Sequence, residues 1–243
     1  GASNQNLILY NDATIFNPSH LFGFFSAFNP DILKNVELYK SGIPSEYGGR
    51  LSAVLDVSTR EGNKRKFSGS GGISPVTGRL TLEGPIVKDK TSFLIAGRST
   101  YSNWLLTKIP SAALRNSQAS FYDANMSLSH QMDDKNSFYA SGYISKDGFK
   151  LGSDTTYQYS NQTVSGKWKH IFGNKFYGIL TGSYSGYDYN VSSEVNPINS
   201  FQLSYSIQQA NIKTDFNYFL NSKHTLNFGA STIHYRMSPG DFQ

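Results

Sequence analysis

From residue 64 to its end, the chain alternates apolar and polar residues with a period of two. In one segment the apolar residues share one parity, and they are Tyr122, Ala124, Met126 and Leu128. The residues of the other parity are polar, namely Asp123, Asn125, Ser127, Ser129 and Gln131. A period of two predicts β-strands that have one apolar face and one wet face.

About eight long antiparallel strands are predicted from this pattern. They run from Phe67 to Val87, Ser92 to Trp104, Ser120 to Met132, Ser137 to Lys150, Tyr159 to Phe172, Phe176 to Tyr189, Phe201 to Leu220 and His224 to Met237. Several exceed the roughly 9 to 11 residues that a tilted strand needs to cross a bilayer. In the segment from Phe201 to Leu220 the apolar phase changes, which predicts a β-bulge at Gln208-Gln209.

Short polar turns and longer loops separate these strands in alternation. The short turns are Lys88 to Lys90, Asp133 to Asn136, Gly173 to Lys175 and Asn221 to Lys223, and longer loops are expected near 106–117, 148–159 and 187–199. Outer-membrane barrels have short turns at one end and longer loops at the other, whereas soluble β-sandwiches lack this regular asymmetry. Eight strands are enough to close a small barrel, or they form part of a larger one.

Residues 1–63 lack the long period-two pattern of the rest of the chain, and we predict that they form a small mixed α/β unit. Short strands are predicted at Leu7 to Tyr10, Val36 to Tyr39 and Leu51 to Ser58. Asn29 and Pro30 form a helix start signal, so a single helical turn is expected over Ile32 to Asn35. The loop from Gly42 to Arg50 joins the last two strands. We therefore predict two domains, 1–63 and 64–243.

The amino-acid composition favours a β-rich protein and excludes some kinds of site. Aromatic residues make up 14% of the chain and it has 22 glycines, a balance that favours β-structure. Without cysteine there are no disulfides or thiolate metal sites. The net charge is +5, but Lys64-Arg65-Lys66 is the only dense basic run, so nucleic-acid binding is not expected.

No catalytic or cofactor signal emerges. The five histidines stand apart without metal-ligand spacing, which predicts no metal site. Gly69-Ser70-Gly71-Gly72 lies in strand-like sequence and lacks the helix and lysine of a phosphate loop. We therefore expect no enzyme and no cofactor.

Three segments of the first hundred residues carry a family resemblance. They are Val36 to Lys40, Gly42 to Arg50 and Leu51 to Val57, and the match continues in Asn17 to Gly23, Asn29-Pro30 and Arg79 to Ile86. This stretch resembles the end of the plug domain and the first barrel hairpin of TonB-dependent outer-membrane receptors. One departure is that Ile43 separates Gly42 from Pro44, a variant familiar among receptors with large nutrient substrates.

The resemblance implies a plug inside a barrel of about 22 strands. Residues 1–63 would be the C-terminal part of the plug, and residues 64–243 would begin the barrel of a longer protein. A nutrient ligand such as a glycan, peptide or siderophore would bind on the outer side. The partners implied are the TonB complex, acting through a region absent here, outer-membrane lipid and a surface lipoprotein, in the outer membrane of a Gram-negative bacterium.

The same resemblance indicates the plug motif and its contact with the barrel. These residues are Glu37, Gly42, Pro44, Tyr47, Gly48, Gly49, Arg50 and Glu83. We expect Gly48 and Gly49 to adopt positive φ or to lie close to other backbone, and Tyr47 to be a packing ring. Arg50 either pairs with Glu83 or is solvated. The alternative function is a small structural or adhesive barrel with an N-terminal cap and no transport role.

Overall fold

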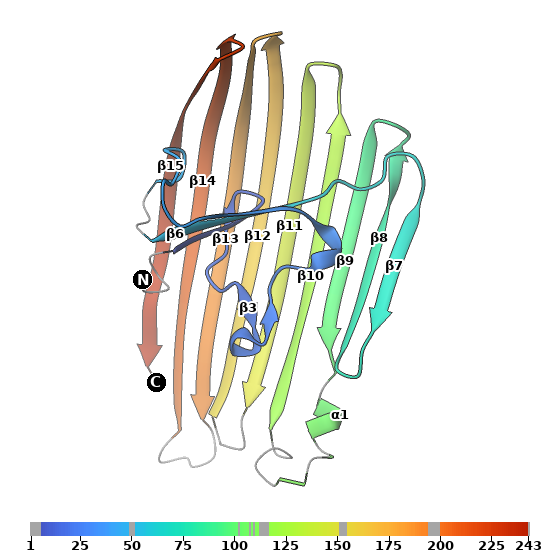
Figure 1. The fold of residues 1–243 in the computed structure, drawn as a ribbon. Coiled ribbons are helices and arrows are strands. Elements are labelled where there is room, and N and C mark those ends of the chain that lie inside the picture. Colours follow the sequence, from blue (N-terminus) through green and yellow to red (C-terminus); the bar gives the residue numbers. More distant parts are fainter. Residues whose placement is uncertain are drawn as a thin grey trace.

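A computed structural model describes residues 6–48, 52–101, 103–106, 108, 110–111, 117–150, 155–193 and 200–242 of the chain. Within these residues the protein is mainly β, as predicted. A wide sheet of long strands carries a smaller N-terminal unit on one face (Figure 1). We call that face the inner face of the sheet and the opposite one the outer face.

The long sheet contains nine strands in simple sequential order, each antiparallel to its neighbours. They are β7 (Ser68–Ile73), β8 (Thr77–Val87), β9 (Thr91–Thr100), β10 (Gln118–Gln131), β11 (Asn136–Lys150), β12 (Thr155–Gly173), β13 (Phe176–Ser193), β14 (Phe201–Asn221) and β15 (His224–Phe242). Among the described residues β7 and β15 share no ladder, so the sheet is open at both edges.

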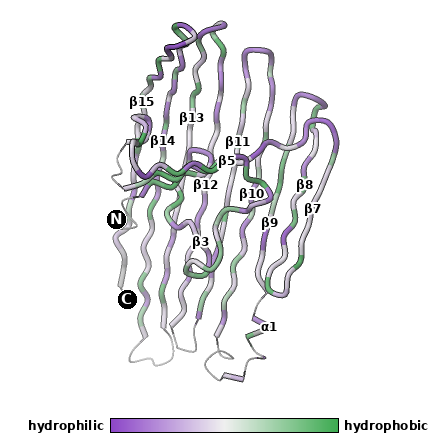
Figure 2. The backbone as a smooth tube through the Cα atoms, viewed as in Figure 1, coloured by the Kyte–Doolittle hydropathy of each residue, from purple (hydrophilic) through white to green (hydrophobic). Residues whose placement is uncertain are grey.

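The N-terminal unit, residues 6–63, is built around a four-stranded sheet in the order β2-β1-β6-β5. Its strands are β1 (Asn6–Tyr10), β2 (Ala13–Thr14), β5 (Leu33–Tyr39) and β6 (Ala53–Thr59), and a small hairpin pairs β3 (Ser19–His20) with β4 (Phe25–Ser26). Two 3₁₀ turns, Leu21–Gly23 and Pro30–Ile32, complete it. The strands of this unit cross the long strands in Figure 1, and hydrophobic and hydrophilic stretches alternate along the unit in Figure 2.

Three sequence-based expectations about elements were wrong. The helical turn lies at Pro30–Ile32, capped by the Asn29 side chain as expected, but Leu33 already begins β5. The segment from Phe67 to Val87 is a hairpin of β7 and β8, because Ser74 hydrogen-bonds Thr77 across a tight turn, so there are nine strands in the described sheet. The strand after Ser92 ends at Thr100, and a short helix, α1, spans Asn103–Leu106.

The four predicted short turns are confirmed, but their alternation with long connections holds only in part, because the β7–β8 turn at the opposite end is tight as well. The β8–β9, β10–β11, β12–β13 and β14–β15 turns lie at one end of the long strands (Figure 1). The connections at the opposite end, which we call the long-loop end, are shorter than expected because β11, β12 and β13 extend into the segments predicted as loops. Residues 112–116, 151–154 and 194–199 of these connections lie outside the described residues.

The outer face carries an apolar band about nine residues tall. On β12 it runs from Val164 to Phe172 and on β13 from Phe176 to Tyr184, and the outward side chains Val164, Trp168 and Leu180 are exposed. Hydrophilic and hydrophobic residues alternate along these strands in Figure 2. The band matches the roughly 9 to 11 residues of a membrane-crossing strand.

The band ends along a line that follows the strand register. Tyr184 is paired with both Val164 and Ala210 on the apolar side of this line. Two residues further towards the long-loop end, Gly186 is paired with Gln162 and Gln208. Beyond that line the outward positions of β12, β13 and β14 are polar residues or glycine, so these three strands continue past the band with a polar outer face.

This boundary explains why the predicted bulge at Gln208-Gln209 was wrong. The register between β13 and β14 is continuous from Phe201 to Tyr218, and the two irregularities between β14 and β15 lie at Ser204/Ser206 and Phe219/Asn221 instead. The apolar residues from Phe201 to Ile207 face inwards, whereas Ala210 and Ile212 face outwards. The apolar phase changes because the apolar side chains of the outer face are confined to the band.

We predict that a charge in the middle of this band destabilises the membrane-inserted protein. Leu180→Arg is expected to cost about 2–4 kcal/mol, because an outward arginine near the bilayer midplane is poorly solvated. Asn190→Arg, outward on the same strand but beyond the band, is the matched control and should cost about 0–1 kcal/mol. Urea unfolding of the full-length protein from lipid vesicles measures both, and equal effects would contradict the assignment of the outer face.

Candidate functional site: the interface between the N-terminal unit and the inner face

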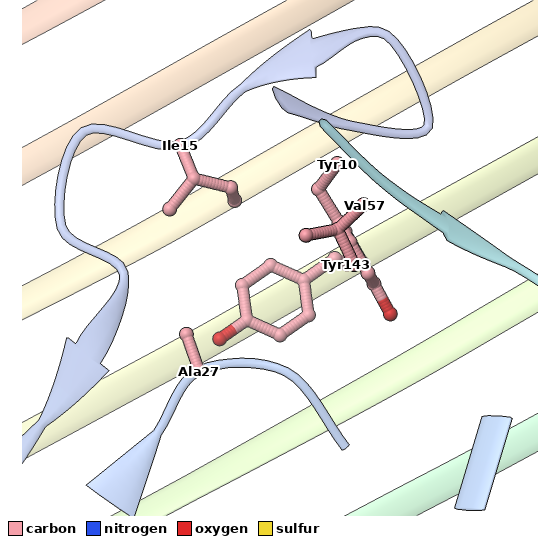
Figure 3. Packing of buried hydrophobic residues seen from close by; sticks show 5 residues of the cluster. All are labelled: Tyr10, Ile15, Ala27, Val57 and Tyr143. Carbon is pink, nitrogen blue, oxygen red and sulfur yellow. The ribbon is translucent and has the colours of Figure 1, made fainter. Parts of the chain in front are cut away.

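A small apolar cluster attaches the N-terminal unit to the middle of the inner face. Tyr10, Ile15, Ala27 and Val57 of the unit are buried against Tyr143 of β11 (Figure 3). The rings of Tyr10 and Tyr143 meet edge to face with centroids 5.5 Å apart, and the Tyr10 hydroxyl donates to Asn125 Oδ1 at 2.6 Å. Rings with polar tips suit this surface, because the inner face itself is mostly polar.

His20 forms the most deeply buried polar contact of the interface. The imidazole and the carboxyl groups of Asp123 and Asp147 have no exposed surface. Nδ1 lies 2.8 Å from Asp147 Oδ2 in a hydrogen bond. Nε2 lies 3.3 Å from Asp123 Oδ2 without hydrogen-bond geometry, so we describe that contact as an ion pair.

Two further groups complete this cluster. Arg98 of β9 donates to Asp123 Oδ2 from Nε at 2.8 Å and forms an ion pair with it through Nη2 at 2.7 Å. The His20 ring stacks on Phe121 with centroids 4.1 Å apart and planes 3° from parallel. With His20 protonated, two cations face two carboxylates, so the buried charges balance.

The pKa of His20 lies above its ordinary value of 6.5. Burial alone would lower this pKa, but the neighbouring Asp123 and Asp147 carboxylates favour the imidazolium and outweigh it. The protonated form of His20 therefore stabilises the attachment of the unit to β10 and β11.

A second attachment fixes the chain where it passes from the unit to the long sheet. Arg60 Nη1 lies 2.6 Å from Glu83 Oε2 on β8, and the Asn63 N–H donates to the same oxygen at 2.8 Å. Between them, Gly62 lies against β9 so closely that a Cβ atom would be 2.0 Å from the Phe93 carbonyl oxygen. Only glycine fits this close approach.

Further ion pairs surround the interface. They join Asp12 to Lys167, Asp31 to Arg79 at 3.1 Å, and Glu46 to Lys213 at 3.9 Å. Each connects an acidic residue of the unit to a basic residue on the inner face. The N-terminal unit is therefore held at its rim mainly by complementary charge.

The sequence-predicted motif lies partly at this interface and partly away from it. Tyr47 packs against Tyr39, donates to Asp56 Oδ2 at 2.7 Å and lines a groove of about 570 Å³ facing β14 and β15. Burial, then the bond to Asp56, raises the pKa of Tyr47. Pro44 accepts the Tyr47 N–H at 3.0 Å, which closes the turn. Tyr47 therefore packs within the N-terminal unit and also lines this groove.

Glu37 and Gly42 have their described roles within the N-terminal unit. Glu37 is exposed on β5, where it accepts hydrogen bonds from Tyr39 and Asn35, which lower its pKa. Gly42 has positive φ at 62° and supplies the left-handed turn of the loop. The expectation for Gly48 was wrong, because its φ is not positive and no atom lies near its Cβ position. Gly49 and Arg50 lie outside the described residues.

The turn after His20 has a strained backbone. Leu21 and Phe22 both have positive φ, at 49° and 57°. Left-handed conformations cost about 1–3 kcal/mol at non-glycine residues. The Leu21 N–H donates to Asp147 Oδ1 at 2.9 Å and the Phe22 N–H to the Tyr159 hydroxyl at 3.2 Å, and these bonds offset the strain.

The central residues of this site were missed at the level of sequence. His20 was noted as an isolated histidine and within the Asn17 to Gly23 match, but not as a site residue, and its partners Arg98, Asp123 and Asp147 come from three different strands. One signal in the sequence could have indicated this site. Asp123 and Asp147 are each the one charged residue among the otherwise neutral inward positions of their strands. Within the described residues no group of His, Asp and Glu has the arrangement of a metal site, and no helix is long and apolar enough to cross a membrane.

Stability should depend on pH through His20. Its folded-state pKa is raised, so its contribution is full below the unfolded value near 6.5 and is lost as the pH rises through the folded value. The melting temperature of the full-length protein in detergent should therefore fall over that range. His20→Gln should remove this dependence and lose about 3–5 kcal/mol near neutral pH, because two buried carboxylates lose a partner. His224→Gln, at the exposed start of β15, is the control, and an identical pH profile in all three proteins would contradict the prediction.

Substituting Arg60 or Arg50 tests which of the two arginines is the partner of Glu83. The structure shows Arg60 in this contact, whereas Arg50 was the partner considered from sequence. Arg60→Ala should loosen the segment after β6, because it removes the cation that pairs with the Glu83 carboxylate. We expect faster trypsin cleavage at Lys64 to Lys66 and about 1–3 kcal/mol of lost stability. Arg50→Ala should have a smaller effect on this cleavage. A larger effect of Arg50→Ala would favour Arg50 as the partner of Glu83.

The sequence matches no protein-family model and no curated protein. Among solved structures, the copper transporter OprC superposes with a TM-score of 0.72 at 9% identity, over 97% of this chain and 38% of OprC. The siderophore receptor PirA from Acinetobacter baumannii gives 0.69 at 15% identity, over 97% and 41%. The ferripyoverdine receptor of the outer membrane of Pseudomonas aeruginosa gives 0.66 at 12% identity, over 96% and 36%.

This chain spans about two fifths of the length of these solved structures. All of them are TonB-dependent outer-membrane receptors. The chain has the fold of the corresponding part of such a receptor.

Proposed function

We propose that this chain is the end of the plug and the start of the barrel of a TonB-dependent receptor that imports a nutrient across the outer membrane. Residues 1–63 would be the plug part and residues 64–243 the barrel part. The observation that carries the proposal is a separate folded unit attached to the polar inner face of a sheet whose outer face has an apolar, membrane-height band. The structural neighbours are transporters and receptors rather than enzymes.

The open sheet favours this function over a small structural or adhesive barrel. In the described residues β7 and β15 form no ladder with each other, so the nine strands do not close around a lumen of their own. An unpaired strand edge in a bilayer leaves backbone groups without partners, which is costly. Further strands of a longer protein would satisfy both edges, and a barrel that large has room for a plug.

The interface also fits a plug that must move during transport. Polar and charged contacts provide much of the attachment, including the three rim ion pairs and the Arg60–Glu83 pair. Water can replace such contacts at modest cost, whereas an extended apolar interface would resist separation. The TonB complex would act through a region outside this chain, and a surface lipoprotein is a further proposed partner.

Deletion of the full-length gene tests this function. The deletion strain should lose growth on at least one scarce nutrient when carbon, nitrogen and iron sources are screened singly. A plasmid copy should restore that growth in a strain with intact TonB and fail to restore it in a strain without TonB. Rescue that is independent of TonB, or a deletion without any nutrient phenotype, would contradict the proposal.

A further inference from the structure

The inner face between the N-terminal unit and the long-loop end is lined by aromatic rings. Tyr159, Tyr189 and Tyr205 are directly opposite one another on three neighbouring strands. The rings of Tyr189 and Tyr205 stack with centroids 4.9 Å apart, and Phe149 and Tyr157 form a second pair on β11 and β12. Tyr159 is buried and the other four rings are partly exposed, and we call these inward rings the ring wall.

The N-terminal unit presents its own rings to this wall. Phe22 contacts Phe149, Tyr157 and Tyr159 edge to face, with centroids 4.9 to 6.1 Å apart. Phe24, two residues on, is 85% exposed at the tip of the same turn. The turn lies on the side of the unit that points to the long-loop end (Figure 1). Its strained backbone is held in place by the bonds to Asp147 and Tyr159 described above.

Within the described residues, the ring wall has no charged side chain that lacks an oppositely charged partner. The inward positions of the wall on β12, β13 and β14 are all uncharged, and they are Thr155, Tyr157, Tyr159, Tyr187, Tyr189, Val191, Phe201, Leu203, Tyr205 and Ile207. The inward lysines of β12, Lys167 and Lys169, lie on the other side of the unit. The charged groups that border the wall on β9, β10 and β11 are Arg98, Asp123 and Asp147, and with His20 they neutralise one another in the buried cluster.

We propose that the ring wall and the Phe22–Phe24 turn bind a neutral carbohydrate, an oligosaccharide that the receptor imports. Flat tyrosine and phenylalanine rings pack against the apolar C–H faces of sugar rings, and tyrosine hydroxyls donate and accept hydrogen bonds with sugar hydroxyls. An anionic ligand would find no free cation among the described residues of this surface. This inference rests on the proposed function and specifies the class of its substrate.

Calorimetric titration of the purified full-length receptor tests this inference. The probes are linear xylo-, manno- and gluco-oligosaccharides, with oligogalacturonates and a ferric tris-catecholate as anionic comparisons. We expect binding of at least one neutral series. Phe24→Ala and Tyr189→Ala should each weaken it by up to roughly tenfold, the loss expected for one ring contact. Tyr189→Phe keeps the ring and should lose less.

Phe67→Ala is the matched control, because Phe67 is an exposed ring just before β7 and away from the ring wall. Its affinity for the saccharide should be unchanged. Absence of binding by every neutral series, or tight binding of an anionic probe that Phe24→Ala does not affect, would overturn the carbohydrate assignment. TonB-dependent uptake of a charged nutrient would leave the proposed function intact while overturning this inference, so the two fail separately.

Discussion

A buried imidazole between two buried carboxylates determines how the N-terminal unit sits on the sheet. The position of His20 is fixed from two sides, because Asp147 lies on β11 and Asp123 on β10. Burying unpaired charge is costly, so these groups must stay together whenever the unit is attached. The strained turn after His20 depends on the same Asp147 carboxylate, which accepts the Leu21 N–H. One contact thus sets both the docking of the unit and the conformation of the turn that faces the ring wall.

The second constraint acts from the opposite face. Within the apolar band the outward positions are apolar, as contact with lipid would require, and the inward positions carry the polar rows that meet the unit. Beyond the band the outward positions of β12, β13 and β14 are polar or glycine, and apolar side chains occupy inward positions instead. The change between Ile207 and Ala210 on one uninterrupted strand records this transition.

These constraints explain what the sequence could and could not predict. Period two and the turn asymmetry depend on local order, and they predicted the long strands and the short turns well. The prediction of a bulge at Gln208-Gln209 was wrong, because the sequence of a single strand does not show where the apolar band of the outer face ends. Gly48 was assigned a special conformation that Gly42 adopts instead, since either glycine of the loop could supply a left-handed residue. The His20 cluster joins residues more than 100 positions apart, and no local pattern indicates such a contact.

The distribution of contacts also bears on how the unit could leave the sheet. Among the described residues, apolar burial against the inner face comes from the cluster around Tyr143, from Ile32 with Leu94 and Ala96, and from ring contacts of Phe22 and Phe25 with the sheet. The remaining attachments are charged or polar, and they can be solvated one after another as water enters. The His20 cluster is the exception, because it is fully buried and its separation would expose two carboxylates and two cations together. Separating the His20 cluster would therefore be the most costly step in displacing the N-terminal unit from the sheet.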